Sequence, residues 1–453
     1  MEPKGGNVSR KYLGGFPGKL LGGLLAGVFM LALAGCGGSG GSSFRPTPTP
    51  VASPSAATNS SVFAVDCETN LAYVPLPFLS NNLTGEVGVL DLSVNPDDKD
   101  PRTATIDLGL TARPHAAAAD MGAGQILVLS DPEISTGVLQ IISESDNSIT
   151  NVSFPTNSRP SVLDGVVYDA SSNTALVSMS NVASTCIGNC TGVAVFDLVS
   201  QTFGPLLNLD NPLNSFALDG AAGVPMGSSD PITPSLYAPD LTASASCQFS
   251  DQNLINLNSD PDGIAVDPTT HLWIAGNFLS PQATVLNLNG ATYTSGSGCM
   301  LDEAGTLPNS VDQNTGTSEN MPGVAINPAT HEALLTADSG EQIALLTLPS
   351  QPVAQLSPTD IHSVFGSIPN DPEGAQFTAA TFPYAVVIDS CHNLGYVLNV
   401  DASFLVQIDL DTLKNHPDEI SKPLKHGSCA GTSTPFACTN GSGIKYFPLP
   451  GVL

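Results

Sequence analysis

Five polar residues are the first candidates for a functional site: His115, Asp262, Glu319, Asn320 and Tyr384. Three of them directly follow a proline at the start of an apolar segment, and the other two lie just before Met321-Pro322. Carboxylate and amide oxygens are the ligands that Ca²⁺ and Mg²⁺ take, and a metal-bound water can attack a lactone or an ester. Polar residues at such places are also what contact with water would produce. The five form one site only if the fold brings them to one place.

Three histidines invite the same question, since imidazole is a common metal ligand. His271, His331 and His392 each follow, by three or four residues, an Asp or Asn that ends an apolar segment. This places each histidine in a polar turn of a different repeat. We therefore expect three separate structural residues, far apart in space, and no shared metal site.

An internal repeat supplies the elements that must position the candidates. Each copy has a short apolar strand, then an Asp or Asn, a polar turn and a second apolar strand. Six copies are clear: residues 62–74, 115–129, 165–179, 263–276, 323–337 and 384–398. Their anchor residues, which end the first strand, are Asp66, Asp120, Asp169, Asp267, Asn327 and Asp389. Ser215-Phe-Ala-Leu-Asp219 is a degenerate seventh copy or the start of a long insertion.

Short strands, polar turns and repeats of about 50 residues predict an all-β propeller, because packed blades bury sheets that could not be buried alone. Residues 61–453 form the propeller domain, with six blades preferred and seven also allowed. The first strand of each repeat is the most apolar and should lie innermost. The starts of these strands then converge on one mouth of a central channel, where the five candidates would meet.

The repeats resemble the YVTN and NHL families of β-propeller repeats. The best matches are Pro261-Asp-Gly-Ile-Ala-Val-Asp-Pro268 and Leu71-Ala-Tyr-Val74, although the YVTN tetrapeptide itself is absent. The resemblance implies the fold and leaves the function open. Propeller hydrolases of the gluconolactonase type hold a divalent cation at the channel mouth, but no ligand motif of theirs can be matched here residue by residue.

The N-terminus predicts export and lipid anchoring. Basic residues precede an apolar run at 20–34, which is shorter than the roughly 20 residues needed to span a bilayer. Leu33-Ala34-Gly35-Cys36 resembles the lipobox of bacterial lipoproteins. Residues 1–35 are thus the expected signal peptide, Cys36 the lipidated residue, and the Gly-, Ser-, Pro- and Thr-rich residues 36–60 a flexible linker. Because Gly37 is not Asp, we expect the outer membrane of a bacterial envelope more than the inner.

Eight further cysteines in an exported chain favour disulfides: Cys67, Cys186, Cys190, Cys247, Cys299, Cys391, Cys429 and Cys438. Cys67 and Cys391 follow the anchors of the first and last clear repeats, which become neighbours when a ring closes, so we expect them to pair. The 186–190 and 429–438 pairs could each close a small loop, and Cys247 would pair with Cys299 by elimination. Zinc is the rival use of clustered cysteines, but no CxxC occurs.

Charge limits the partners. The chain has 13 Lys and Arg against 41 Asp and Glu, a net charge of −28, and no Lys or Arg between residues 160 and 413. This excludes nucleic acid, which needs basic patches, and leaves a basic protein, a glycan or a divalent cation. The function expected from the sequence is a lipid-anchored binding or scaffolding module of the envelope. The alternative is a lactonase-like hydrolase that uses Ca²⁺ or Mg²⁺ at the channel mouth.

Overall fold

The fold was determined as a computed structural model. It describes residues 61–76, 85–96, 99–109, 113–120, 122–130, 137–154, 160–170, 172–182, 191–209, 213, 215–220, 224–229, 235–237, 254–256, 261–277, 280–289, 292–293, 301–302, 309–315, 323–337, 342–368, 383–399, 404–421 and 443–449. The predicted signal peptide, Cys36 and the linker lie outside these residues. Within them, no helix has the length and apolar character of a membrane span.

The described chain folds into seven four-stranded antiparallel sheets, each strand pairing with the next along the chain. Blade 1 contains β1 (Ala64–Asp66), β2 (Leu71–Pro75), β3 (Gly85–Asp91) and β4 (Arg102–Gly109). Blade 2 contains β5 (Pro114–Asp120), β6 (Gln125–Ser130), β7 (Val138–Ser143) and β8 (Ile149–Ser153). Blade 3 contains β9 (Pro160–Asp169), β10 (Thr174–Val182), β11 (Thr191–Asp197) and β12 (Thr202–Leu209). Blade 4 contains β13 (Ser215–Asp219), β14 (Val224–Ser229), β15 (Ser235–Tyr237) and β16 (Leu254–Asn256).

The second half of the chain continues the pattern. Blade 5 contains β17 (Pro261–Asp267), β18 (Leu272–Asn277), β19 (Gln282–Asn287) and β22 (Asn309–Asn314), with the small hairpin β20 (Thr292–Tyr293) and β21 (Leu301–Asp302) inserted before its last strand. Blade 6 contains β23 (Gly323–Asn327), β24 (Glu332–Ala337), β25 (Gln342–Thr347) and β26 (His362–Ser367), with the 3-10 helix η2 (Pro358–Asp360). Blade 7 contains β27 (Pro383–Asp389), β28 (Leu394–Asn399), β29 (Phe404–Asp409) and β30 (Ile444–Pro448), with helices α1 (Leu410–Asn415) and α2 (Pro417–Ile420).

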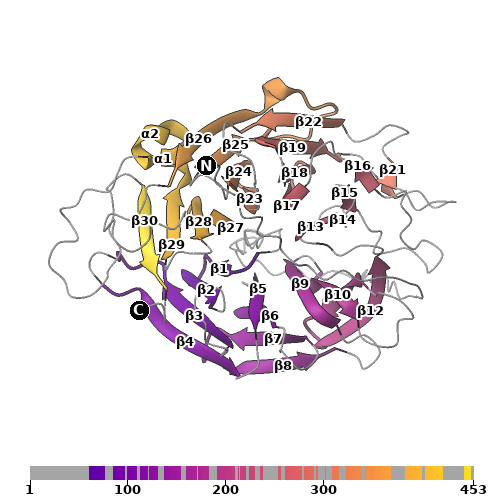
Figure 1. The fold of residues 1–453 in the computed structure, drawn as a ribbon, viewed down its shortest axis with the longest axis vertical. Helices are drawn as coiled ribbons and strands as arrows, with labels where there is room; N and C mark the ends of the chain where they lie inside the picture. Colours follow the sequence, from indigo (N-terminus) through magenta and orange to yellow (C-terminus); the bar gives the residue numbers. More distant parts are fainter. Residues whose placement is uncertain are drawn as a thin grey trace, which may run out of the picture.

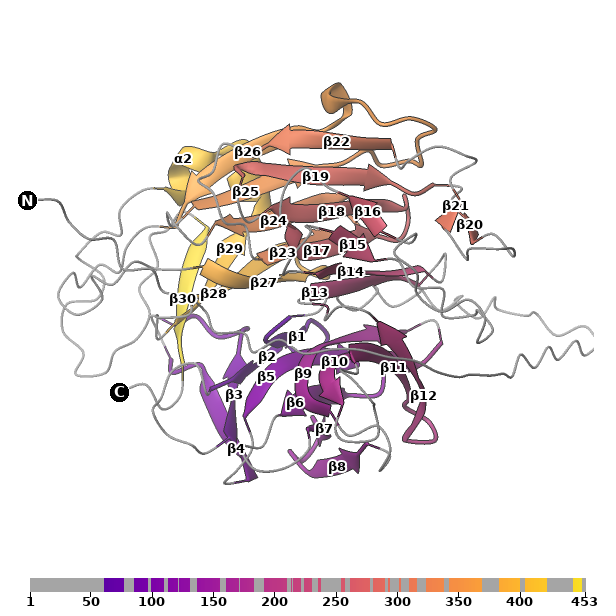
Figure 2. The same ribbon diagram turned by 45° about the vertical axis from the view of Figure 1, so that its right-hand side comes forward.

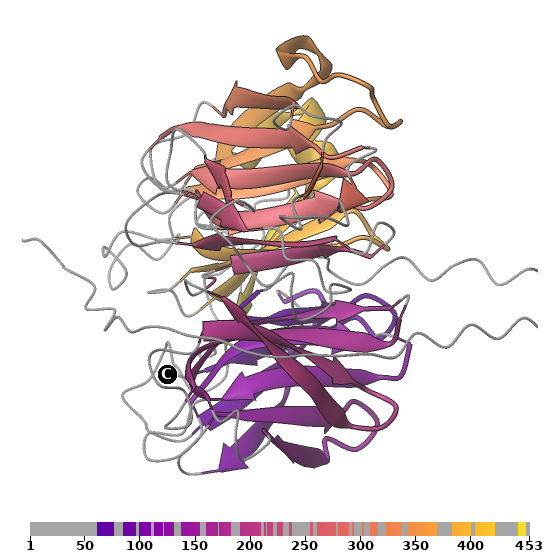
Figure 3. The ribbon, with the colours of Figure 1, turned by 90° about the vertical axis from the view of Figure 1, so that its right-hand side faces the viewer.

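The sheets close into a ring around the first strand of each blade (Figure 1). Each innermost strand contacts the innermost strands of the two neighbouring blades, and β27 of the last blade contacts β1 of the first. Figure 2 shows the ring obliquely and Figure 3 shows it from the side, with the purple blades from the start of the chain below the orange blades. The prediction of an all-β propeller, with the apolar first strands innermost, is confirmed.

The ring has seven blades, the larger of the two numbers that the repeats allowed. Six was preferred because the segment after Asp219 alternates weakly. The degenerate copy at Ser215–Asp219 nevertheless forms β13 and opens a complete blade. The two outer strands of this blade, β15 and β16, have only three residues each, which is too short for alternation to be visible in the sequence.

The hydrophobic core is divided among the seven junctions between neighbouring blades. Successive side chains of a strand point to opposite faces, so each inner strand packs against both neighbours. In β6, for example, Leu127 and Leu129 face blade 3, whereas Ile126 and Val128 face blade 1. Trp273 is fully buried in the apolar cluster between blades 4 and 5. Blade-to-blade packing therefore supplies the apolar burial that a single four-stranded sheet lacks.

Candidate functional site

Three of the predicted candidates lie at one end of the ring. His115, Asp262 and Tyr384 are each the second residue of an innermost strand, in β5, β17 and β27. At each of them the pairing with the second strand shifts register, so the residue after the proline is left out of the ladder. A bulge of this kind redirects a side chain away from the sheet. The other two candidates, Glu319 and Asn320, lie outside the described residues.

A fourth position of the same kind was missed in the sequence. The register of β9 shifts between Gly165 and Leu163, which leaves Asp164 out of its ladder. Asp164 precedes its anchor Asp169 by five residues, as Asp262 precedes Asp267. The sequence signal for this position is the Asp-Gly pair that opens both repeats, Asp164-Gly165 and Asp262-Gly263. The repeat at 165–179 was taken to begin at its glycine, which left Asp164 out. We call the end that carries His115, Asp164, Asp262 and Tyr384 the mouth.

The mouth at blade 5 is fixed to blade 4 by hydrogen bonds. Ser228, which is fully buried at the end of β14, donates from its hydroxyl to the backbone oxygen of Asp262 at 2.6 Å. The backbone N–H of Ile264 donates to the hydroxyl of Ser215 at 3.3 Å. These bonds hold the bulge against the neighbouring blade, so the position of Asp262 is set by two blades.

The opposite end of the ring holds the anchor residues, and we call it the anchor end. Most anchors are almost fully buried, with Asp120 and Asp219 at 1 % exposure and Asp267 and Asn327 at 0 %. Four residues after its anchor, each turn places a residue in the left-handed region, with φ between 53° and 62°: Asn70, Gly124, Asn173, His271, His331 and Asn393. Glycine and asparagine adopt this conformation most easily. A histidine there therefore indicates that its side chain is needed.

Two of the histidines join neighbouring blades at the anchor end. Nδ1 of His271 in blade 5 lies 2.6 Å from Oδ2 of Asp219 in blade 4. Nδ1 of His331 in blade 6 lies 2.7 Å from Oδ2 of Asp267 in blade 5. Because a carboxylate oxygen only accepts, each imidazole donates. The prediction that these histidines are structural residues on separate blades is confirmed.

The other turns at the anchor end use different side-chain contacts in place of the imidazole–carboxylate pair. At the next junction an amide pair replaces the carboxylate and imidazole, with Nδ2 of Asn327 donating to Oδ1 of Asn393 at 2.8 Å. His392 instead bonds the anchor of its own blade, Asp389, at 2.8 Å, and its side chain is 46 % exposed. Between blades 2 and 3 the phenol of Tyr168 lies against the Asp120 carboxylate. Burial, and then Asp120, raise the pKa of that phenol.

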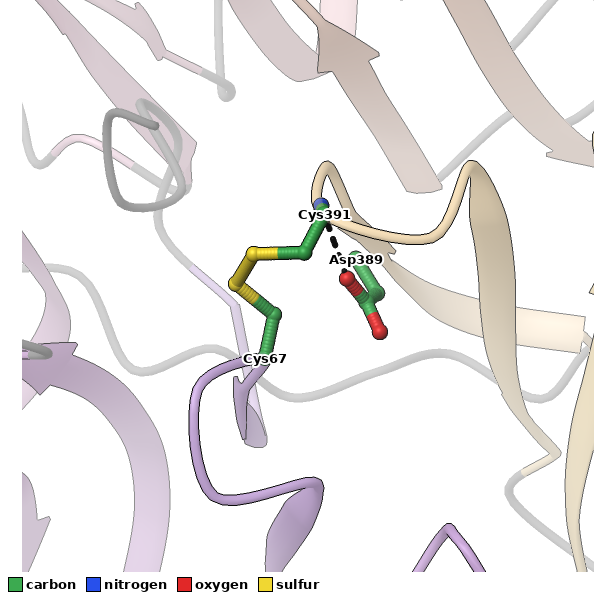
Figure 4. Close-up of side chains that lie close together, drawn as sticks. All are labelled: Cys67, Asp389 and Cys391. Carbon is green, nitrogen blue, oxygen red and sulfur yellow. Dashed lines mark hydrogen bonds between the residues drawn. A yellow bond between two sulfur atoms is a disulfide. The ribbon is translucent and has the colours of Figure 1, made fainter. Parts of the chain in front are cut away.

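The junction between blades 7 and 1 is closed covalently. Cys67 follows the anchor of blade 1, Cys391 follows Asp389 of blade 7, and their sulfur atoms form a disulfide with Cα atoms 5.8 Å apart (Figure 4). This is the pairing predicted from ring closure. Among the described residues, Cys67, Asp389 and Cys391 are also the group of three potential metal ligands, but the disulfide uses both sulfur atoms. The other cysteine candidates, at 186, 190, 247, 299, 429 and 438, lie outside the described residues.

The C-terminal segment completes blade 7. β30 pairs with β29 from Ile444 to Pro448, so all four strands of this blade come from the same end of the chain. No described strand is exchanged between the first and last blades. The disulfide and an apolar cluster that includes Phe63, Tyr396 and Phe447 therefore hold the junction.

The junction between blades 1 and 2 carries an unusual group, the carboxyl cluster, formed by Asp66, Tyr73 and Glu144. Glu144 follows β7 of blade 2, and its carboxyl group lies against Asp66 and the phenol of Tyr73 from blade 1. Burial, and next the Asp66 carboxylate, raise the pKa of Glu144 to about 8. Burial and Glu144 raise the pKa of Tyr73. Sequence reasoning missed Glu144, because it sits in an ordinary polar turn between β7 and β8.

Comparison with known proteins gives the fold. No family model and no curated protein sequence matches the chain. Hydrazine synthase from Kuenenia stuttgartiensis has a similar structure, with a TM-score of 0.51 and 11 % identity over 81 % of this chain and 98 % of that one. A chain of a mitotic checkpoint complex gives a TM-score of 0.49 and 9 % identity, over 75 % of this chain and 86 % of that one. The β-propeller domain of Myceliophteria thermophila Cps50 (Swd1) gives a TM-score of 0.45 and 10 % identity, over 65 % of this chain and 81 % of that one. At 11 % identity, the likeness to the hydrazine synthase chain shows the fold alone and no particular function.

Proposed function

We propose that this chain is an exported, lipid-anchored β-propeller that binds a partner of the bacterial envelope at its mouth. One observation carries the proposal: the two ends of the ring differ. The anchor end is closed by paired side chains that join one blade to the next, whereas at the mouth the bulged strand starts of blades 2, 3, 5 and 7 are occupied by different polar residue types. Variation at equivalent positions suits recognition.

Charge and surface character narrow the partner. The net charge of −28 argues for a basic protein surface or a neutral glycan and against nucleic acid. Among the described residues, the exposed large hydrophobic side chains are Val199 and Phe365, on different blades, so an apolar patch is not what the partner would bind. The partner should therefore contact polar groups at the mouth.

The anchoring half of the proposal rests on the lipobox-like Leu33-Ala34-Gly35-Cys36 and on the linker at 36–60. Metabolic labelling with a clickable fatty acid tests it directly in a bacterial host. The wild-type chain should carry label and fractionate with membranes, mainly the outer membrane. Cys36→Ser should lose both, while Cys67→Ser should keep the label. Equal labelling of the Cys36→Ser chain would overturn lipidation at this residue.

The binding half can be tested by site-specific photocrosslinking in cells. A photoreactive amino acid at His115 places the probe at the mouth, and the same probe at Thr105 places it on the exposed outer strand β4. A discrete adduct at position 115 and none at 105 is the expected result. The adduct should weaken when Asp262→Asn is added. Equal adducts at both positions would show that the mouth is not the binding surface.

The metal-dependent hydrolase is the second candidate, and one observation favours it. Asp164 and Asp262 hold the same bulged position in β9 and β17, so two acidic residues lie at the mouth. Ca²⁺ or Mg²⁺ bound there could activate water against a lactone or ester. The purified chain should then hydrolyse such compounds only with the cation, and Asp262→Asn should abolish the activity. If the wild-type chain hydrolyses no lactone or ester of a test panel, either with or without Ca²⁺ or Mg²⁺, this candidate function is excluded.

A further inference from the structure

The carboxyl cluster brings two acidic side chains together without a compensating partner. Asp66 is 1 % exposed, and its Oδ1 accepts from the backbone N–H groups of Glu68 at 2.7 Å and Thr69 at 3.4 Å. Both carboxyl oxygens of Glu144 are shielded from solvent, and neither makes a hydrogen bond of normal geometry with a described residue, although the group lies against Asp66 and Tyr73. No ion pair in the described part of the chain reaches either carboxyl group.

Tyr73 supplies a second and independent observation. Its side chain is fully buried in β2, and its hydroxyl lies against Glu144 but makes no hydrogen bond of normal geometry with any residue described. A buried phenol normally finds such a partner. Three oxygen-bearing side chains from two blades therefore lie together, and a positively charged or donating species would satisfy all three.

The charge balance identifies that species. A single proton shared by the two carboxyl groups would leave one buried negative charge, with Glu68 adding a further negative charge nearby. A divalent cation would neutralise both carboxylates and accept the phenol oxygen as a neutral ligand. Ca²⁺ takes carboxylate and neutral oxygen ligands in irregular geometry, whereas Mg²⁺ demands near-octahedral geometry and keeps several waters. The shielded, irregular cluster suits the larger ion.

We propose that Asp66, Tyr73 and Glu144 form a Ca²⁺ site that joins blade 1 to blade 2. The site lies at the anchor end, where the other described junctions use imidazole, amide, phenol or disulfide partners. It is therefore independent of the mouth and of the function proposed for it. The ion does for this junction what the imidazoles of His271 and His331 do for theirs: it gives a buried anchor carboxylate a partner that joins it to the next blade.

Calcium titration of the purified full chain, stripped with EDTA and held in detergent at pH 7.5, tests the proposal by thermal unfolding and calorimetry. The wild-type chain should show a saturable rise in Tm and bind one Ca²⁺ at this site. Glu144→Gln should reduce the affinity by at least about tenfold, since even loss of an outer ligand contact costs that much. Tyr73→Phe should weaken binding less, because only a neutral ligand is lost.

Two controls keep the result specific. Asp262→Asn alters the mouth and should leave the titration unchanged, so failure of the mouth proposal and failure of this one are distinguishable. In EDTA, Glu144→Gln should be more stable than the wild-type chain, because it removes carboxylate repulsion, and this excludes simple misfolding. A Ca²⁺ response that survives in Glu144→Gln would overturn the site. So would a wild-type chain that shows no response to any divalent cation and is stabilised only as the pH falls.

Discussion

Two junctions of the ring use the same anchor position for opposite electrostatics. Between blades 5 and 6, the buried carboxylate of Asp267 receives an imidazole N–H from His331 at 2.7 Å. Between blades 1 and 2, the buried carboxylate of Asp66 meets another carboxyl group, that of Glu144. The anchor is an Asp in both cases, and the neighbouring blade alone decides whether it meets a hydrogen-bond donor or a second carboxyl group. The difference teaches that equivalent repeat positions do not carry equivalent energies.

The junction between blades 7 and 1 is a third solution, because a covalent bond takes the place of a polar contact. There the anchor Asp389 bonds a histidine of its own blade, and the disulfide makes the link between the two blades. Changes at the three junctions should therefore have graded effects on stability.

The largest effect is expected from the disulfide. Cys67→Ser with Cys391→Ser should lower the free energy of unfolding by about 2–5 kcal/mol, because the bond links residues 324 apart and no described strand is exchanged across this junction. Urea unfolding under oxidising conditions measures the loss. Reductant should bring the wild-type chain toward the double variant, and identical unfolding of both chains without reductant would contradict the role given to this bond.

The next largest effect is expected at Asp267, the anchor residue at the junction between blades 5 and 6. Asp267→Ala removes a fully buried carboxylate that accepts from His331 and from the backbone and hydroxyl of Thr269, and should cost about 3 kcal/mol. Asp197→Ala is the matched control, since its exposed carboxylate makes similar turn bonds to Val199 and Ser200 without a neighbouring blade. A similar loss in both variants, measured by urea unfolding, would show that the turn and not the junction matters.

A smaller effect is expected from the histidines. His331→Ala leaves Oδ2 of Asp267 without its imidazole donor and should cost about 1–3 kcal/mol. His392→Ala should cost less than about 0.5 kcal/mol, because that side chain is 46 % exposed and bonds only its own blade. Unfolding curves at one pH compare the pair. An equal cost would remove the distinction between contacts within a blade and contacts between blades.

The sharpest test of the junction between blades 1 and 2 is a pH dependence. Folding raises the pKa of Glu144 from its ordinary 4.5 to about 8, so the cation-free native state holds a proton that the unfolded state has released. Stability from this group is present below pH 4.5 and is lost as the pH rises through about 8. Without divalent cation, the difference in stability between the wild-type chain and Glu144→Gln should therefore change across this window. Parallel curves would contradict the raised pKa.

The sequence alone determined the strands and their order. Apolar alternation and polar turns are local properties, so the innermost strands, the tail strand at 444–448 and the seven-residue runs of β5, β17 and β27 follow from residues close together in the chain. Repeat position was also enough to place Cys67 beside Cys391, because a closed ring makes its first and last copies neighbours. His115, Asp262 and Tyr384 could be placed at the mouth for the same reason, because each lies at the start of the first strand of its repeat.

Only the tertiary structure decided the seventh blade and the junction partners. Three-residue strands such as β15 gain their pairing from the sheet around them, which no local pattern records. His271 and Asp219 are 52 residues apart and His331 and Asp267 are 64 apart, so packing of whole blades sets these contacts. Glu144 looks like any turn acid until blade 2 places it against Asp66. The strands arise from local patterning, whereas the electrostatics of the ring arise from side chains that meet only after the blades have packed.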